Sequence, residues 1–334
     1  MKSLPILVFG VFFLGTMPVA TASPWTLPAD ELVLSLSQDF HYARDEFLPD
    51  GTRQAFPLEG EFRAISTRIG ARYGFTDRIE TYLELNIAAV TFRSDPLILA
   101  NFPEGATAAE ATDSIISFNT VEFGAADLNL GFRGNLLRGP VMITTGTEAK
   151  IPTGYDRPTG TFFVESDGSP GQGGQATLGD GQADITQYLH FGTFLPATRT
   201  FARLDLGFRY RFSSPGHQGL AGLRAGQFVG DNVVLTAGVG WLQTLFEGEV
   251  IGESYVARDA NLPANQYTLE DIEIIEIGLD RDAVTLEAGL IATIRGIEVQ
   301  ANYGYTFLGA NTAATHVVSL GTILVLPELT ARSR

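Results

Sequence analysis

The chain of 334 residues contains no cysteine, which excludes disulfide bonds and thiolate chemistry. Histidine is also scarce, and His41, His190, His217 and His316 are far apart in the sequence. Such isolated histidines do not form the closely spaced ligand sets of protein metal sites. We therefore expect no metal site, and no motif in the chain predicts a cofactor.

Basic residues are outnumbered, with 22 Lys and Arg against 38 Asp and Glu and a net charge of −16. Nucleic-acid binding needs a basic surface, so this balance argues against a nucleic-acid partner. Long apolar runs are missing after the N-terminus, because the last candidate, residues 317–327, is short and interrupted by Ser319, Gly321 and Thr322. The sequence therefore predicts no transmembrane helix.

The N-terminus has the features of an export signal. Lys2 is followed by an apolar stretch at residues 4–15, and Ala20-Thr21-Ala22 provides small residues for cleavage. The stretch is too short to span a bilayer, which disfavours the alternative of a membrane anchor. We expect residues 1–22 to be a signal peptide and residues 23–334 to form one domain.

The remaining chain is dominated by residues that alternate between apolar and polar. In residues 201–212, Leu204, Leu206 and Phe208 fall on one face of an extended strand, and Arg203 and Asp205 on the other. A soluble sandwich would turn the charged face to water. A membrane barrel would turn the apolar face to lipid and the charged face to a wet lumen.

Twelve segments have this alternation, and most are much longer than the five or six residues or so that are usual in soluble sheets. They are residues 31–40, 61–73, 79–92, 122–137, 141–151, 182–194, 201–212, 219–229, 233–245, 282–294, 297–308 and 312–326. The alternating piece at 270–277 could extend a neighbouring strand. The last segment stops at Leu326, and a polar tail without a terminal aromatic residue follows.

The connections between these segments are sorted by length. Short turns are expected at 74–77, 138–140, 195–198, 230–232 and 295–296, and long connections at 41–60, 93–120, 152–180 and 246–279. If the first strand starts in the periplasm, all the short turns fall on one side, as in transmembrane barrels. The sequence therefore predicts an all-β, antiparallel up-and-down transmembrane barrel of about twelve strands. We expect it in the outer membrane of a Gram-negative bacterium, with interfacial aromatics that include Tyr73, Phe92, Phe212, Trp241, Tyr305 and Phe307.

Two blocks of sequence, residues 123–156 and 178–195, resemble the outer-membrane proteins associated with the aromatic (phenol) meta-cleavage pathway. The resemblance rests on Lys150, Pro152, Thr153 and Gly154, followed by Leu178, Gly179, Gly181 and Asp184; the turn at 74–80 is also similar. It covers about the middle third of the chain. The resemblance implies a transporter-like barrel for hydrophobic small molecules. The long 246–279 segment and the non-aromatic C-terminus depart from that pattern, which leaves the solute open.

The polar faces carry charges of both signs. The candidates for lining the lumen are Arg68, Arg72, Glu84, Asp127, Arg133, Glu148, Lys150, Asp184, Arg203, Asp205, Arg209, Arg211, Glu287 and Glu298. They could form a selective pore wall. The alternative, which we favour for any single residue, is a lattice of cross-strand ion pairs that fills a narrow lumen.

Other motifs carry little chemistry. Residues 152–154 and 178–184 could shape a mouth over the pore or only end and restart strands, and the glycine-rich part lacks the Lys-Ser/Thr of a phosphate loop. Ser213, Ser214 and His217 form the only tight Ser/His cluster, without a supporting catalytic context. The acidic run at 270–276 could bind divalent cations, but a solvated loop is favoured.

The sequence therefore predicts a non-enzymatic barrel without catalytic residues that passes small molecules, hydrophobic or aromatic ones among them, by a passive route. Its expected partners are outer-membrane lipids and an unknown solute. One alternative is a structural or adhesive surface protein with an occluded lumen. A more distant alternative is an outer-membrane lipid hydrolase.

Overall fold

The computed structural model describes residues 24–98, 115–116, 119–155, 158, 162–164, 170–172, 177–212, 216–246, 248, 250–257, 262 and 272–326. The expected signal peptide lies outside these residues. Among them, no helix is long and apolar enough to cross a membrane.

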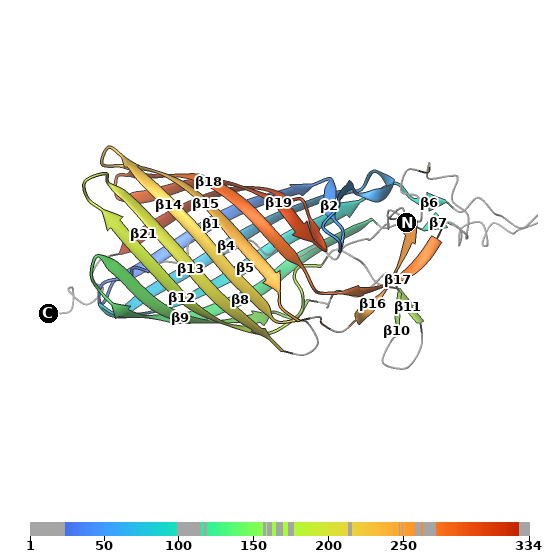
Figure 1. Ribbon diagram of the computed structural model, residues 1–334, viewed down its shortest axis with the longest axis horizontal. Helices are drawn as coiled ribbons and strands as arrows, with labels where there is room; N and C mark the ends of the chain where they lie inside the picture. Colours follow the sequence, from blue (N-terminus) through green and yellow to red (C-terminus); the bar gives the residue numbers. More distant parts are fainter. Residues whose placement is uncertain are drawn as a thin grey trace, which may run out of the picture.

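Twelve long antiparallel strands close into a barrel, which confirms the predicted fold class (Figure 1). The strands are β1 (Leu32–Ala43), β4 (Glu61–Thr76), β5 (Ile79–Arg93), β8 (Thr120–Leu137), β9 (Val141–Pro152), β12 (Asp184–Leu195), β13 (Thr200–Arg211), β14 (Gln218–Val229), β15 (Val233–Thr244), β18 (Asp282–Ile294), β19 (Ile297–Ala310) and β21 (His316–Leu326). Each strand pairs with its neighbour along the chain, and β1 pairs with β21 from Leu32↔Leu326 to Tyr42↔His316. This last pairing leaves no open edge, so every backbone group in the wall can be satisfied inside the sheet.

Connection length separates the two ends of the barrel. Turns of two to four residues join β4 to β5, β8 to β9, β12 to β13, β14 to β15, and β18 to β19 at what we call the inner end. Arg295 and Gly296 both have positive φ, 54° and 85°, as a two-residue hairpin turn requires. The long connections emerge at the opposite, outer end, where Figure 1 shows the small strands gathered.

The small strands form separate sheets, which corrects two expectations. Residues 272–278 (β17, Ile272–Gly278) do not extend a barrel strand; they pair with β16 (Val250–Ala257) in a four-stranded sheet with β10 (Phe162–Val164) and β11 (Pro170–Gln172). Thr312 and Ala313 (β20) leave the last predicted strand and pair with β2 (Asp45–Phe47), which also pairs with β3 (Arg53–Ala55). Both expectations failed because local alternation shows which face a residue occupies but not which strand its segment pairs with. β6 (Leu97–Ile98) and β7 (Ile115–Ile116) form a fourth, two-stranded sheet, and Pro57–Glu59 forms a 3-10 turn.

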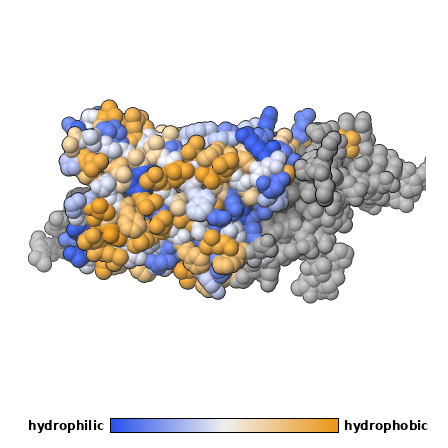
Figure 2. Space-filling model, in the orientation of Figure 1, coloured by the Kyte–Doolittle hydropathy of each residue, from blue (hydrophilic) through white to orange (hydrophobic). Residues whose placement is uncertain are grey.

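Side chains alternate across the wall as the sequence predicts. On β13, Leu204, Leu206, Phe208 and Tyr210 are exposed, whereas Asp205 and Arg211 are buried. Figure 2 shows apolar side chains gathered over the outside of the barrel. An apolar outer wall around a charged interior is the pattern of a barrel that spans a membrane. This fold agrees with the expected location in a Gram-negative outer membrane.

One expected girdle residue is on the wrong face. Phe92 is fully buried inside the barrel, where its ring packs edge-on against Phe56 at 5.7 Å. It shares the parity of Glu80 and Glu84 on β5, so period two places it inward even though it lies near a strand end. Trp241, in contrast, is exposed on the outside.

Candidate functional site: the lumen

The charged lumen-facing side chains of β4, β5 and β8 converge on Glu80, which is completely buried. Its carboxylate accepts ion pairs from Arg72 at 3.0 Å and Arg133 at 2.7 Å. It also accepts a hydrogen bond from the backbone N–H of Leu27 at 2.8 Å. Two guanidinium groups and one amide thus surround a single carboxylate. A buried charge held this way is tolerated because its partners replace the lost water.

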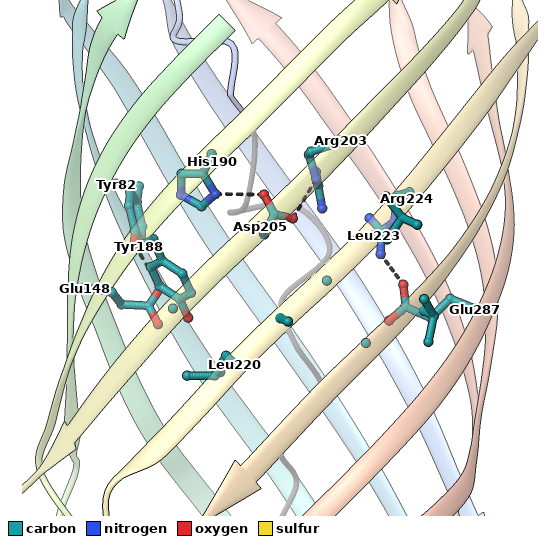
Figure 3. A pocket seen from close by; sticks show the side chains of 15 residues that line it. Tyr82, Glu148, Tyr188, His190, Arg203, Asp205, Leu220, Leu223, Arg224 and Glu287 are labelled. Atoms are coloured by element: carbon teal, nitrogen blue, oxygen red, sulfur yellow. Dashed lines mark hydrogen bonds and ion pairs between the residues drawn. The ribbon is translucent and has the colours of Figure 1, made fainter. Parts of the chain in front are cut away.

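A second group of polar side chains lies midway along the lumen (Figure 3). Tyr82 donates its hydroxyl to Glu148 at 2.9 Å, and the Arg133 guanidinium lies 5.2 Å from the centre of the Tyr82 ring. Across the strands, Asp205 contacts the His190 Nδ1 and the Arg203 Nε, each at 2.8 Å. These contacts link β5 to β8 and β9, and β12 to β13.

Near the outer end, the residues that directly precede β12 fold into the barrel. Residues 177–182 are buried, and Asp180 pairs with Lys150 and, at 2.6 Å, with Arg211. Lys150 also contacts Asp184 at 2.9 Å. Burial acts to raise the pKa of Asp180, but the charges of Lys150 and Arg211 outweigh it and hold this pKa well below its ordinary value. The segment 178–184 therefore closes part of the outer mouth.

Tyr155 supports the same segment. Its hydroxyl donates to Asp127 at 2.6 Å and accepts the Gly181 N–H at 3.1 Å. Burial and the neighbouring Asp127 carboxylate raise the pKa of Tyr155, so the phenol stays protonated. The Lys-Ile-Pro-Thr-Gly motif (residues 150–154) is thus followed directly by Tyr155, which holds the Leu-Gly-Asp-Gly motif (residues 178–181) in place.

The remaining lumen candidates lie on other parts of the wall. Arg68 pairs with Asp39 at 2.9 Å, and Glu287 pairs with Arg224. Arg209 donates to Gln218 at 3.1 Å and to Thr186 at 3.3 Å. Glu84 is buried, and Glu298 is half-buried near the inner end of β19. As determinants of solute passage, all fourteen candidates stay a proposal.

Sequence reasoning missed a segment that enters the lumen from the inner end. Residues 24–27 precede β1, and the Pro24 carbonyl accepts hydrogen bonds from Thr144 and, at 3.3 Å, from Asn135. The Trp25 ring packs edge-on against Phe201 at 6.0 Å. The only signal for this placement was Trp25 itself, a large apolar residue outside any strand pattern.

Cavities remain among these side chains, and three of them are lined by described residues. The middle cavity, about 650 Å³, is lined by Tyr82, Tyr188, His190, Arg203 and Leu220, among others. The outer cavity, about 970 Å³, shares Gly240 and Glu287 with it and extends to Thr312 and Thr315 near the outer end. The inner cavity, about 440 Å³, shares Arg68, Asn302 and Ser319 with the outer cavity and extends to Ser35 near the inner end.

The Ser/His hypothesis gains no support from His217. Its ring lies 4.4 Å from that of Tyr210 and 5.9 Å from that of Phe208, and its Nδ1 accepts the Arg211 N–H at 3.4 Å. Ser213 and Ser214 lie outside the described residues. Within the described part of the chain, no three His, Asp or Glu side chains are placed to hold a metal ion. The side chains of the acidic run at 270–276 are not described.

Comparisons with known proteins identify the fold. No family model matches the chain, and no curated protein matches its sequence. An outer membrane channel from Pseudomonas putida F1 is similar in structure, with a TM-score of 0.62, 12% identity, and coverage of 93% of this chain and 100% of that one. The NanC porin gives a TM-score of 0.44 at 8% identity, covering 86% of this chain and 98% of that one. A mutant of the TodX monoaromatic hydrocarbon channel gives 0.43 at 9% identity, covering 95% of each chain. The first similarity supports the twelve-stranded barrel; the other two are too low to carry an argument.

Proposed function

We propose that this protein is an outer-membrane channel for the passive passage of small molecules. The observation that carries the proposal is the set of cavities that share wall residues within a closed barrel. The outer cavity shares Gly240 with the middle cavity and Ser319 with the inner one. A lumen filled only by ion pairs would not leave such adjoining cavities. The similarity to a solved outer membrane channel is consistent with the proposal through its fold.

The rings that line the middle cavity support the passage of molecules with an apolar or aromatic part. Tyr188 and His190 stack with their centroids 5.4 Å apart, and Leu220 lines the same cavity. Glu148 and Arg203 add charges close to these rings, as Figure 3 shows. A solute there would meet both apolar and hydrogen-bonding groups, which is typical of small-molecule sites.

Single-channel recording in planar bilayers tests the proposal. We expect the purified protein to give discrete conductance steps. The variant Gly240→Trp, at the junction of two cavities, should reduce the step size, because the indole would fill shared space. The control variant Gly219→Trp places the same side chain beside Leu245 on the outer face and should leave the step unchanged.

A closed structural or adhesive protein is the alternative that this experiment excludes. Such a protein would show no discrete steps in any of the three forms. It would also fail to release small neutral solutes in liposome-swelling assays. If Gly219→Trp alone reduced the conductance, the observed current would not pass through the cavities described above.

A further inference from the structure

The two halves of the lumen differ in how they are filled. The half formed by β5, β8, β9, β12 and β13 holds large side chains in mutual contact, such as Arg133, Tyr82 and Glu148. The wall formed by β1, β18, β19 and β21 carries mostly small or neutral polar side chains. Those that line the outer or inner cavity include Ser35, Ser37, Thr285, Asn302, Ser319 and Gly321. We call these four strands the open wall.

The N-terminal segment lies against the filled half. At the inner end it contacts Gly74, Asp77 and Arg138. Inside the barrel it contacts Glu80, Asn135, Thr144, Gly192 and Phe201, which belong to β5, β8, β9, β12 and β13. None of these five residues lines the inner cavity. The inner cavity therefore lies beside this segment, on the other side of the lumen.

The adjoining outer and inner cavities offer a route along the barrel axis. The outer cavity begins among Thr312 and Thr315, and it meets the inner cavity at Arg68, Asn302 and Ser319. The inner cavity continues to Ser35 and Ile323, which face each other three positions from the inner ends of β1 and β21. The route thus covers most of the height of the wall.

The chemistry of this route favours hydrogen bonding over charge. Its hydroxyl and amide groups can both donate and accept hydrogen bonds. The Arg68 charge is matched by Asp39 at 2.9 Å, and Glu287 by Arg224. The two further charged residues that line the route, Glu84 and Arg281, are of opposite sign, so neither sign dominates there. His41, which is buried and lines the outer cavity, has an Nε2 atom with no hydrogen-bond partner among the described residues. A buried nitrogen of this kind is free to bind a polar solute.

We infer that solutes cross the barrel along the open wall, beside an N-terminal segment that stays in place, and that this route favours neutral hydrogen-bonding molecules over ions. The inference rests on the proposed channel function and specifies where the channel runs. It assigns a structural role to Arg133 and Glu80 in the filled half, and it places the middle cavity beside the route, next to the outer cavity at Gly240 and Glu287. It assigns selectivity to the hydroxyl and amide groups of the open wall.

The absence of native cysteine allows a background-free test by thiol labelling. Ser319→Cys places a thiol where the two cavities meet, and Thr186→Cys places one at a buried lumen position on β12 in the filled half. We expect the neutral, hydrophilic reagent hydroxyethyl methanethiosulfonate to label Ser319→Cys rapidly and to reduce its conductance. It should leave the mass and the conductance of Thr186→Cys unchanged. Labelling and block of Thr186→Cys, with Ser319→Cys protected, would overturn the inference.

Labelling measured by mass spectrometry also separates this inference from the proposed function. Suppose that the protein shows no conductance, yet Ser319→Cys is modified and Thr186→Cys is not. The channel proposal then fails, while the open wall is verified as the water-accessible side of the lumen. If the protein conducts and both positions react equally, the channel proposal holds and the one-sided route is wrong.

A cross-link tests whether the N-terminal segment stays in place. A Cβ built on Gly192 would lie 3.0 Å from the Cβ of Pro24, near the separation of about 3.5–4.5 Å found in disulfides. The double variant Pro24→Cys/Gly192→Cys should therefore form a bond on oxidation. We expect the same conductance before and after reduction, with bond formation verified by mass. A several-fold rise on reduction would show that the segment blocks the route.

Permeation measurements test the solute class. In a salt gradient, the reversal potential of the native protein should stay near zero, because the charges along the open wall are matched in sign. Liposomes that contain the protein should swell in glycerol or ribose faster than in equally sized anionic or cationic solutes. Strong selectivity for either ion, with exclusion of the neutral solutes, would contradict the inference.

Discussion

At the scale of single residues, burial decides which ion pairs matter. Glu80 is completely buried between Arg72 and Arg133, whereas the pair between Arg199 and Asp231 is largely exposed at the inner end. Removing one partner of a buried pair leaves an uncompensated charge, but an exposed pair is screened by water. Two pairs of similar length therefore contribute very differently to stability.

We expect Glu80→Gln to lower the free energy of unfolding by about 3–5 kcal/mol, since it leaves the buried guanidinium of Arg133 and the half-buried one of Arg72 without their carboxylate. Asp231→Asn, the exposed control, should cost less than about 1 kcal/mol. Urea unfolding of the protein in detergent micelles measures both. Equal losses for the two variants would show that Glu80 has no special role.

The Asp180 cluster gives the outer mouth a defined pH dependence. Because the folded-state pKa of Asp180 is lowered, its stabilising effect is complete above the unfolded-state pKa of about 3.9. It is lost as the pH falls further toward the folded-state value. We expect Asp180→Asn to be less stable than the native protein at neutral pH and to lose less stability on acidification below about pH 4. Thermal unfolding followed by circular dichroism across this range provides the measurement; parallel curves for the two proteins would contradict it.

At the scale of elements, the period of two along a strand decides which face of the wall each side chain occupies. The depth of that position in the membrane decides how strongly a charged substitution on the outer face destabilises the barrel. Leu206 lies in the middle of β13 on the exposed face, and Leu195 lies at the inner end of β12. In an outer membrane we expect lipid around the first and the membrane–water interface around the second.

Leu206→Arg should destabilise the barrel by about 2–4 kcal/mol, and Leu195→Arg by no more than about 1 kcal/mol, because the cost of an arginine falls toward the interfaces. Reversible unfolding in phospholipid vesicles measures both differences. If Leu206→Arg were tolerated as well as Leu195→Arg, the apolar face of β13 would not meet the bilayer core.

At the scale of the whole molecule, closure depends on the pairing of the first and last strands. Eleven residue pairs join β1 to β21, from one end of β1 almost to the other. β1 already pairs with β4 on its other side, and β21 already pairs with β19. Only the pairing of β1 with β21 can therefore close the sheet. Closure is therefore a property of the complete strand set.

We expect the unboiled native protein to migrate differently from the boiled protein on SDS gels, because a closed barrel resists the detergent. A variant truncated after Thr315 lacks β21 and should lose this difference, since β1 and β19 would keep open edges. A native protein that migrated identically in both states would argue against closure.

The sequence alone determined the number of long strands, their faces and the end of the barrel at which each long connection lies. These features are local: alternation with period two assigns each side chain to one face, and short turns force neighbouring strands to pair. The exposed Leu204 and Leu206 and the buried Asp205 follow directly from that alternation.

Only the tertiary structure decided which charges meet, where the N-terminal segment lies and which wall stays open. Glu80 meets Arg133 because the register of β5 and β8 pairs them directly, and Arg72 reaches Glu80 diagonally from β4, where it pairs with Tyr82 two positions further along β5. Pro24 reaches Thr144 across 120 positions of sequence. Such contacts depend on closure, which brings distant segments into one lumen, and no local pattern records them.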